Sequence, residues 1–347
     1  MLTRLNSIPH GMLDKKAHEL HEYLPGPTLI SLEGLNKQPL FLSILLHGNE
    51  DSGWEALRDL LKAYQDQPLP RTLFIFIGNV LAAAKGLRKL DSQTDFNRVW
   101  GDSDADEAIV MQTVLEEVSG LDLFASVDIH NNTGLNPHYA CINKLQPEFV
   151  NLAKGFSRSI VYFVRPQGVQ SIAFSKFCPA VTLECGQPGD QLGIEKAKTF
   201  ITKLLLQDKL AQQMPEKDDF NLFHTTAIIK IPEQYSFSFD GSQADIEFIQ
   251  GIERHNFEEI DSGTPLARIA SGVDLPFLVL EESGEDIFND FFILQDGQLF
   301  TRKPMMPSML TDNLTIVRQD CLCYLMERYQ PEWGEKIIQD KGKSWNN

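Results

Sequence analysis

The sequence predicts an α/β fold, in which a mixed, mostly parallel sheet is flanked by helices and followed by a small C-terminal β-rich domain. Strand-like apolar runs alternate with helix-like segments between residues 25 and 210, as they do in such sheets. A polar, proline-containing stretch over residues 212–219 is typical of a linker. Short strand-like runs separated by Gly, Asp and Ser follow this linker and indicate a separate all-β part.

Each predicted element is placed by its hydrophobic period. An amphipathic pattern predicts a first helix over residues 11–24, before Pro25-Gly26-Pro27. Short β-compatible apolar runs then predict strands at 28–32, 40–46, 72–77, 123–129, 139–142, 160–164 and 180–183. Helical spacing predicts helices at 53–64, 106–118, 147–157 and 191–208. Beyond the linker, strands are expected at 224–231, 235–239, 266–269, 277–280 and 291–294.

These elements predict three parts of the 347-residue chain, which is long enough for one large domain and a smaller one. The large α/β domain covers residues 1–215, and the small β domain covers residues 216–310. Residues 311–347 are expected to form a C-terminal helix, at roughly 311–329, and a polar tail.

Composition narrows the class of function. A net charge of −17 argues against a nucleic-acid or anionic-membrane surface, because either would need a basic patch. No apolar stretch approaches the ~20 residues of a membrane span, and the first residues lack the apolar segment of a secretory signal. The five cysteines are odd in number and scattered, without a CxxC pair. We therefore expect a cytoplasmic protein without a disulfide framework, and its oligomeric state, including a homo-oligomer, stays open.

Two residues that can bind a metal follow the apolar run 40–46. His47 comes directly after this run, and Glu50 lies three positions later, before the predicted helix 53–64. Open α/β sheets bind their ligands at the carboxyl ends of strands, which is where both side chains are expected. A His and a Glu at this spacing on a tight loop can point at one ion, so we interpret them as two ligands of a metal site.

A second histidine that follows a strand supplies a third candidate metal ligand. A catalytic zinc usually has three protein ligands, and two histidines with a glutamate are one such set. His130 follows the apolar run 121–129, so a parallel sheet would bring it to the same edge as His47. Asp128 lies two residues earlier and is a candidate to orient the site. The pair His18 and His21 falls one position short of the HExxH motif, and we interpret it as part of a solvated helix face.

A carboxylate and a basic segment supply the remaining candidates. Glu184 follows the apolar run 180–183, just before a Gly/Pro turn. Its carboxylate either caps the next helix or forms a salt bridge, or it serves as a general base for the attacking water. Residues 85–98 hold four cations, including Arg88 and Arg98. This segment is either an ordinary basic surface loop or a part of the site that clamps a carboxylate or stabilises an oxyanion.

Four segments in one order carry a family resemblance. His47-Gly48-Asn49-Glu50, Asp95-Phe96-Asn97-Arg98, Asp128-Ile129-His130-Asn131 and Leu183-Glu184-Cys185-Gly186 together resemble the succinylglutamate desuccinylase/aspartoacylase family. That family belongs to the zinc carboxypeptidase superfamily, so the resemblance implies a zinc carboxypeptidase-like fold. It covers roughly residues 25–210, and the β-rich part that follows fits the family's small C-terminal domain.

The resemblance implies roles for individual residues. One Zn²⁺ per chain would be bound by His47, Glu50 and His130, with Glu184 as the catalytic carboxylate. Asn97 and Arg98 match the pair that holds the substrate's carboxylate in the family. Arg88 matches the arginine that polarises the carbonyl and stabilises the oxyanion, although its spacing to the pair is about two residues longer.

The sequence also departs from the family pattern. The family's Asp-Leu-Asn-Arg is Asp-Phe-Asn-Arg here, and residues 170–176 lack the further substrate-binding arginine of the aspartoacylases. Lys176 or Arg165 are the two candidates to replace it. The substrate-contacting tyrosine that the family carries in its C-terminal domain has no clear match in this sequence.

The resulting prediction is a zinc-dependent hydrolase that cleaves an amide bond in a small anionic substrate, of the N-acyl amino acid deacylase type. A metallocarboxypeptidase that trims short peptides is the alternative, because the two differ in pocket depth, which a sequence does not give. A non-catalytic zinc-dependent protein that binds anions through Arg88 and Arg98 is a second alternative. The acyl group, the amino-acid preference and the physiological metal stay open.

Overall fold

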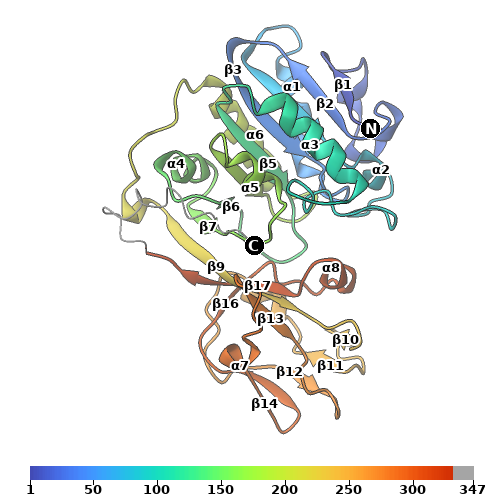
Figure 1. Ribbon diagram of the computed structural model, residues 1–347, viewed down its shortest axis with the longest axis vertical. Helices are drawn as coiled ribbons and strands as arrows, with labels where there is room; N and C mark the ends of the chain where they lie inside the picture. Colours follow the sequence, from blue (N-terminus) through green and yellow to red (C-terminus); the bar gives the residue numbers. More distant parts are fainter. Residues whose placement is uncertain (331–347) are drawn as a thin grey trace.

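The computed structural model describes residues 1–330, whose strands form one large mixed sheet and one smaller sheet. Figure 1 shows the α/β part at one end of the molecule and the smaller sheet at the other, with β9 and β17 between them. The large sheet contains 12 strands of the described chain, which are β1 (Thr3–Leu5), β2 (Thr28–Leu32), β3 (Gly34–Ile44), β4 (Leu69–Ile77), β5 (Ala125–His130), β6 (Tyr139–Ile142), β7 (Ser159–Tyr162), β8 (Ala180–Glu184), β9 (Asn221–Lys230), β13 (Leu278–Glu281), β16 (Met306–Ser308) and β17 (Cys323–Arg328).

The middle of this sheet brings three strand ends together. The strand order is β1-β2-β4-β3-β5-β8-β6-β7-β9-β17-β16, with β13 paired to β9. Strands β4, β3, β5 and β8 are parallel to one another, whereas β6 is antiparallel to β8. In this register Ile44 lies opposite Ile129, and His130 lies opposite Glu184. The carboxyl ends of β3, β5 and β8 therefore meet at one edge of the sheet, which confirms the predicted fold class.

Helices cover this sheet and bury its apolar side chains. They are α1 (Ser52–Ala63), α2 (Val80–Ala83), α3 (Asp106–Val118), α4 (Pro147–Phe156), α5 (Gln170–Phe174) and α6 (Gln191–Leu206). α1 and α6 pack against each other, and α4 packs on β6 and β8. The central strands are buried along their whole predicted apolar runs, as expected for parallel strands that have helices on both faces. Each of the four helices predicted in this part is present, with bounds that differ by at most two residues.

The smaller sheet has its own apolar core. Its five strands in the described chain are β10 (Phe237–Ser238), β11 (Ile246–Phe248), β12 (Pro265–Ile269), β14 (Phe292–Gln295) and β15 (Gln298–Thr301). In this core the ring of Phe277 stacks on that of Phe248 with centroids 5.8 Å apart, and it meets the ring of Phe292 edge to face at 5.3 Å. The short helices are α7 (Phe288–Phe291), α8 (Leu314–Gln319), η1 (Met12–Asp14), η2 (Ala17–Glu22), η3 (Lys217–Asp219) and η4 (Ile252–His255).

Two predicted helices are wrong. The segment 11–24 forms η1 and η2 instead of one α-helix, because Lys15 and Lys16 are extended. The carbonyl that this break frees at Lys15 accepts a hydrogen bond from Trp54 Nε1. The segment 311–329 forms the short α8 and then the strand β17, which pairs with both β9 and β16. Pairing with two strands buries Cys323, Leu325 and Met326 more completely than an isolated helix face would.

The predicted boundary at residue 215 falls between elements that share a sheet. β9 pairs with β7 of the first part and with β13 and β17 of the second, so hydrogen bonding is continuous across the linker. The division into residues 1–215, 216–310 and 311–347 stays a proposal about domains, and the predicted polar tail lies largely outside the described residues. No helix within residues 1–330 combines the length and the apolar character that crossing a lipid bilayer requires.

Candidate metal centre and active site

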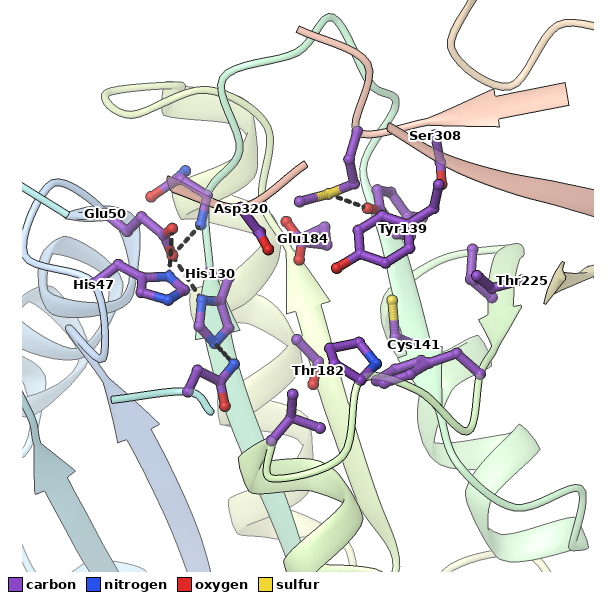
Figure 2. A pocket seen from close by; sticks show the side chains of 18 of the residues that line it. His47, Glu50, His130, Tyr139, Cys141, Thr182, Glu184, Thr225, Ser308 and Asp320 are labelled. Atoms are coloured by element: carbon purple, nitrogen blue, oxygen red, sulfur yellow. Dashed lines mark hydrogen bonds and ion pairs between the residues drawn. The ribbon is translucent and has the colours of Figure 1, made fainter. Parts of the chain in front are cut away.

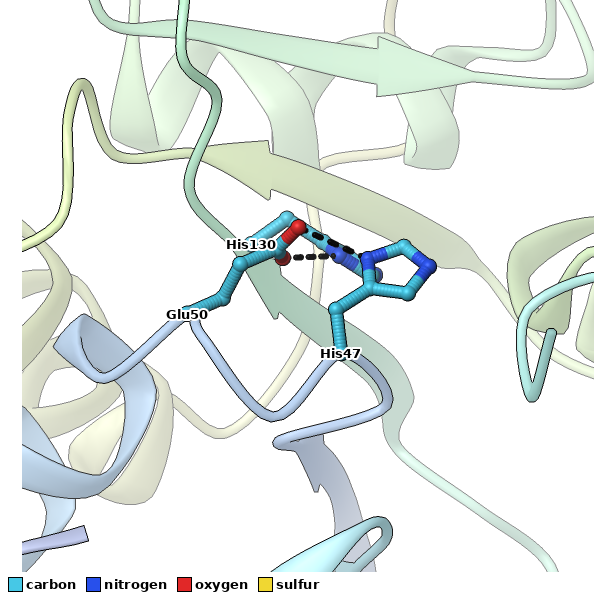
Figure 3. A group of neighbouring side chains, drawn as sticks. All are labelled: His47, Glu50 and His130. Carbon is cyan, nitrogen blue, oxygen red and sulfur yellow. Dashed lines mark hydrogen bonds and ion pairs between the residues drawn. The ribbon is translucent and has the colours of Figure 1, made fainter. Parts of the chain in front are cut away.

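The three predicted metal ligands converge at the edge where β3 and β5 end. His47 Nδ1 lies 2.7 Å from Glu50 Oε1, and His130 Nδ1 lies 2.7 Å from Glu50 Oε2. One ligand atom from each residue falls within 4.8 Å of the other two, and all three side chains are buried (Figure 3). Two imidazole nitrogens and a carboxylate that face one another at this spacing fit the donor set of a catalytic zinc.

Local backbone geometry places His47 and Glu50 on a tight turn. β3 ends at Ile44, and Leu45 has a φ of 54°, which turns the chain sharply before His47. Gly48 packs against the backbone of α2, where a Cβ atom would lie 2.3 Å from Ala83 N, so no larger residue fits. Glu50 lies two residues before α1, whose N-cap residue is Asp51. The turn therefore depends on a glycine that lies between the two ligands.

Carboxylates hold the outer nitrogen of each histidine. His47 Nε2 lies 3.0 Å from Asp95 Oδ1, and His130 Nε2 lies 2.7 Å from Asp128 Oδ2. Such contacts fix the tautomer of a ligating imidazole and leave the other nitrogen, here Nδ1, for the metal. The orienting role expected of Asp128 thus has a matching contact, and Asp95 adds a second one that the sequence did not suggest.

The charges of this group favour an ionised Glu50. Burial penalises the Glu50 carboxylate, but the adjacent His47 and His130 outweigh it and hold the pKa of Glu50 well below its usual range. Burial likewise opposes the charged form of His130, yet Asp128 and Glu50 raise its pKa. A bound divalent cation would take the place of the imidazolium proton beside the ionised Glu50 carboxylate.

We expect Asp128→Asn to weaken zinc binding about 10- to 100-fold, because the amide no longer fixes the Nδ1-available tautomer of His130. Asp128 is completely buried, and its other oxygen accepts a 2.5 Å hydrogen bond from Ser43 Oγ, so the near-isosteric amide keeps the packing. Competition with a chromophoric chelator measures the affinity, with the surface variant Asp122→Asn as the matched control. Equal affinities in the two variants would contradict the orienting role of Asp128.

Glu184 lies beside the proposed ligands at the end of β8. Its backbone is opposite His130 in the β5–β8 register, and its Oε2 accepts a 3.1 Å hydrogen bond from Asn132 Nδ2. Burial, aided by the negative charge of Glu50, raises the pKa of Glu184 to about 7. A carboxylate with such a pKa exchanges protons readily near neutral pH, as a general base and acid must. The alternative helix-cap role is taken by Asp190, whose side chain accepts from the first amides of α6.

The proposed ligands and Glu184 line one pocket, whose cavity volume is about 100 Å³ (Figure 2). Arg88, Asn97 and Arg98 line the same pocket, so the structure brings together every site residue predicted from the sequence. The wall beyond Glu184 is largely apolar and comes from several strands and the following loops; it includes Tyr139, Cys141, Val161, Phe163, Val169, Met309 and Tyr324.

Both predicted arginines are engaged with carboxylates in the pocket. Arg88 donates from Nε and Nη2 to Asp95 Oδ2 at 3.1 and 2.9 Å, and its Nη1 lies 3.8 Å from Glu50 Oε1. Arg98 donates from Nη2 to Asp320 Oδ1 at 2.7 Å. The arginines therefore belong to a buried charge network that reaches the proposed metal ligands.

Asn97 contacts several of the elements that form the pocket. Its Oδ1 accepts a 2.9 Å hydrogen bond from the backbone N–H of Gln170, and its backbone carbonyl accepts a 2.8 Å hydrogen bond from Arg98 Nη1. Its Nδ2 lies 3.2 Å from His130 Nε2. Asn97 thus links the loop before α3 to α5 and helps to fix the guanidinium group of Arg98.

Other histidines and cations lie elsewhere. His18 and His21 are exposed on η2, as expected for a solvated face. Of the two candidates for a further substrate-binding cation, Arg165 lines the pocket, whereas Lys176 is exposed and does not. No ion pair joins Arg165 to another described residue.

Asp320 is a pocket residue that no pattern in the sequence predicted. It lies in the segment predicted as one continuous helix, and the structure places it after α8, where its side chain enters the pocket. Tyr139 and Tyr324 also line the pocket without having been predicted. Asp320 ends the short polar run Arg318-Gln319-Asp320, and such a run in a helix-like segment usually lies on a solvated helix face.

Comparison with known proteins relates the site to one family. The family model described as the succinylglutamate desuccinylase/aspartoacylase catalytic domain matches residues 37–201, which include all the predicted site residues. No curated protein sequence matches this chain significantly.

Solved structures share the fold at low sequence identity. A succinylglutamate desuccinylase from Chromobacterium violaceum is 16% identical, with 86% of each chain covered and a TM-score of 0.56. A succinylglutamate desuccinylase/aspartoacylase from Rhodobacter sphaeroides is 14% identical over 86% of this chain and 88% of that one, with a TM-score of 0.54. Murine aminoacylase 3 is 13% identical over 86% and 96%, with a TM-score of 0.53.

Proposed function

We propose that this chain, whose residues 37–201 match the catalytic-domain model of the succinylglutamate desuccinylase/aspartoacylase family, cleaves an amide bond in a small carboxylate-bearing substrate with the help of one Zn²⁺. The observation that carries the proposal is the buried group formed by His47, Glu50 and His130, with Glu184 beside it. A set of three ligands and a separate basic carboxylate is what metal-assisted hydrolysis needs.

The ligand set suits zinc in its chemistry. Imidazole nitrogen and carboxylate oxygen are common zinc ligands, and the outer nitrogens of His47 and His130 are already held by Asp95 and Asp128. When bound there, zinc would polarise the substrate carbonyl and make a water molecule more acidic. His47, Glu50 and His130 would hold it.

The chain's own residues account for the remaining steps. Glu184 takes a proton from the attacking water at one carboxylate oxygen while Asn132 keeps the other in place, and it later gives the proton to the leaving nitrogen. The Arg88 guanidinium, fixed by two hydrogen bonds to Asp95, stabilises the negative charge that develops on the carbonyl oxygen. The apolar wall around Tyr139 and Phe163 excludes water from the rest of the substrate.

Substrate recognition is proposed to depend on cations in the pocket. Arg98, positioned by Asn97, binds the carboxylate next to the scissile amide. Arg165 is proposed to replace the family's further substrate-binding arginine, because it lines the pocket and Lys176 does not. Murine aminoacylase 3 and the succinylglutamate desuccinylases carry names of N-acyl amino acid hydrolases, which supports this substrate class.

We expect Arg165→Gln to raise KM about tenfold while kcat changes little, because a charge-assisted hydrogen bond worth about 1.5 kcal/mol is lost on binding. Steady-state kinetics on the best N-acyl amino acid measures both constants. Lys176→Gln is the matched control, since it removes one nearby exposed cation that does not line the pocket. An equal rise of KM in both variants would show a general charge effect and contradict the role of Arg165.

The proposed activity is tested by an assay of the zinc-loaded protein on a panel of N-acyl amino acids and short peptides. Release of a free amino acid from N-acyl amino acids supports the proposal, and trimming of the peptides alone would instead indicate a carboxypeptidase. Stoichiometric zinc without hydrolysis of either class would indicate an anion-binding protein. A cytoplasmic setting is proposed with this function, because the five cysteines are free and buried.

A further inference from the structure

An internal carboxylate occupies the arginines that are proposed to receive the substrate. Asp320 Oδ1 accepts a 2.7 Å hydrogen bond from Arg98 Nη2, and Asp320 Oδ2 lies 3.5 Å from Arg88 Nη2. One carboxylate thus bridges both guanidinium groups, which is how two arginines commonly hold the carboxylate of a ligand. Figure 2 draws Asp320 among the side chains that line the pocket.

The contact is built into the fold. The backbone N–H of Asp320 donates to Ile316 O and closes α8. Two residues later, the backbone N–H of Leu322 donates to Ile229 O of β9. The neighbouring Cys321 and Leu322 are buried. Only 12% of the Asp320 side chain is exposed, so its carboxylate is held in the pocket by the segment between α8 and β17.

Asp320 changes the charge that a substrate meets. Asp95 and Glu50 already face Arg88, and Asp320 faces both arginines, so both guanidinium charges have carboxylate partners within the protein. A substrate carboxylate that approaches Arg98 therefore meets an arginine that is already paired. Displacing or crowding a buried, hydrogen-bonded carboxylate costs binding free energy, since two like charges then lie close together.

We propose that Asp320 is a specificity-determining residue, which competes with the substrate's carboxylate for Arg98 and Arg88. The inference rests on the proposed function, because it takes Arg98 as the substrate's anchor. A substrate that presents an anionic group to Arg98 binds less tightly than it would if Arg98 and Arg88 had no carboxylate partner in the protein. Substrates with a neutral group at this position are not penalised.

The test compares two ligands that differ only in this group. N-acetyl-L-alanine carries the carboxylate, and N-acetyl-L-alanine amide carries a neutral carboxamide in its place. Their affinities are measured by calorimetry on zinc-loaded Glu184→Gln protein, so that neither ligand is consumed, with and without Asp320→Asn. We expect Asp320→Asn to tighten binding of the acid about tenfold and to change binding of the amide less than twofold.

Two further variants separate competition from other effects. Asp312→Asn removes the same charge from an exposed position just before α8 and should leave both affinities unchanged. Asp320→Glu keeps the charge and should keep the wild-type ratio of the two affinities. Thermal unfolding of each variant shows whether the segment stays folded.

Several results would overturn the proposal. Unchanged or weaker binding of the acid to Asp320→Asn would show that Asp320 only orients the arginines. An equal gain in affinity for the acid and the amide would show that Asp320 only blocks space. If neither ligand binds to any variant, the arginines are not an anion site. Failure of the proposed hydrolysis is seen separately, in the activity assay with intact Glu184, because the calorimetric comparison needs no turnover.

Discussion

Replacing Glu184 with Gln is expected to lower kcat by about 10²–10⁴-fold, because a general acid–base group contributes that much to the rate. The amide has almost the same shape as the carboxylate, and its oxygen can still accept the hydrogen bond from Asn132. It cannot take a proton from water at neutral pH. Zinc binding is expected to persist, because Glu184 is not among the three residues that face one another as ligands.

The measurement pairs steady-state kinetics with metal analysis of the same preparation. Glu116→Gln is the matched control, since it makes the same change at an exposed position on α3. Loss of kcat with retained zinc supports Glu184 as the base. Retained activity would contradict the role, and loss of zinc together with activity would make Glu184 a ligand instead.

Replacing His130 with Ala is expected to abolish zinc binding and, with it, activity. The substitution removes one of the three ligand atoms and leaves the buried Glu50 carboxylate without one of its two imidazole partners. A ligand that binds the folded chain stabilises it by about 2.7 kcal/mol at one hundred times its dissociation constant. We expect zinc to raise the unfolding temperature of the wild-type chain and to leave that of the variant unchanged.

Thermal unfolding with and without added zinc checks this expectation, alongside the zinc content of the purified protein. His10→Ala is the control, because His10 is exposed and distant in sequence from the site. A zinc-dependent rise of equal size in the His130 variant would place the metal elsewhere on the chain.

The sequence predicted the part of the site that depends on strand ends. His47, His130 and Glu184 each follow an apolar run, and parallel neighbours necessarily bring such residues to one edge. Only the period of the apolar residues and the sense of the strands are needed to place them there.

The contacts of side chains from distant segments were beyond sequence reasoning. Asp320 pairs with Arg98 and Arg88, but nothing in the order of residues indicates that this carboxylate lies near those arginines. Asp320 lies more than 200 positions from both arginines, and its segment carries a helix-like pattern that the pairing of β17 with β9 overrides. Tertiary pairing decided the structure there, where local propensity was ambiguous.

The most direct measurement of the central claim is a crystal structure of the zinc-loaded protein with anomalous data collected on both sides of the zinc absorption edge. We expect one zinc per chain, bound by Nδ1 of His47, a carboxylate oxygen of Glu50 and Nδ1 of His130, with Glu184 beside it. An anomalous peak at any other group, or no peak at full zinc loading, would contradict the proposed zinc site.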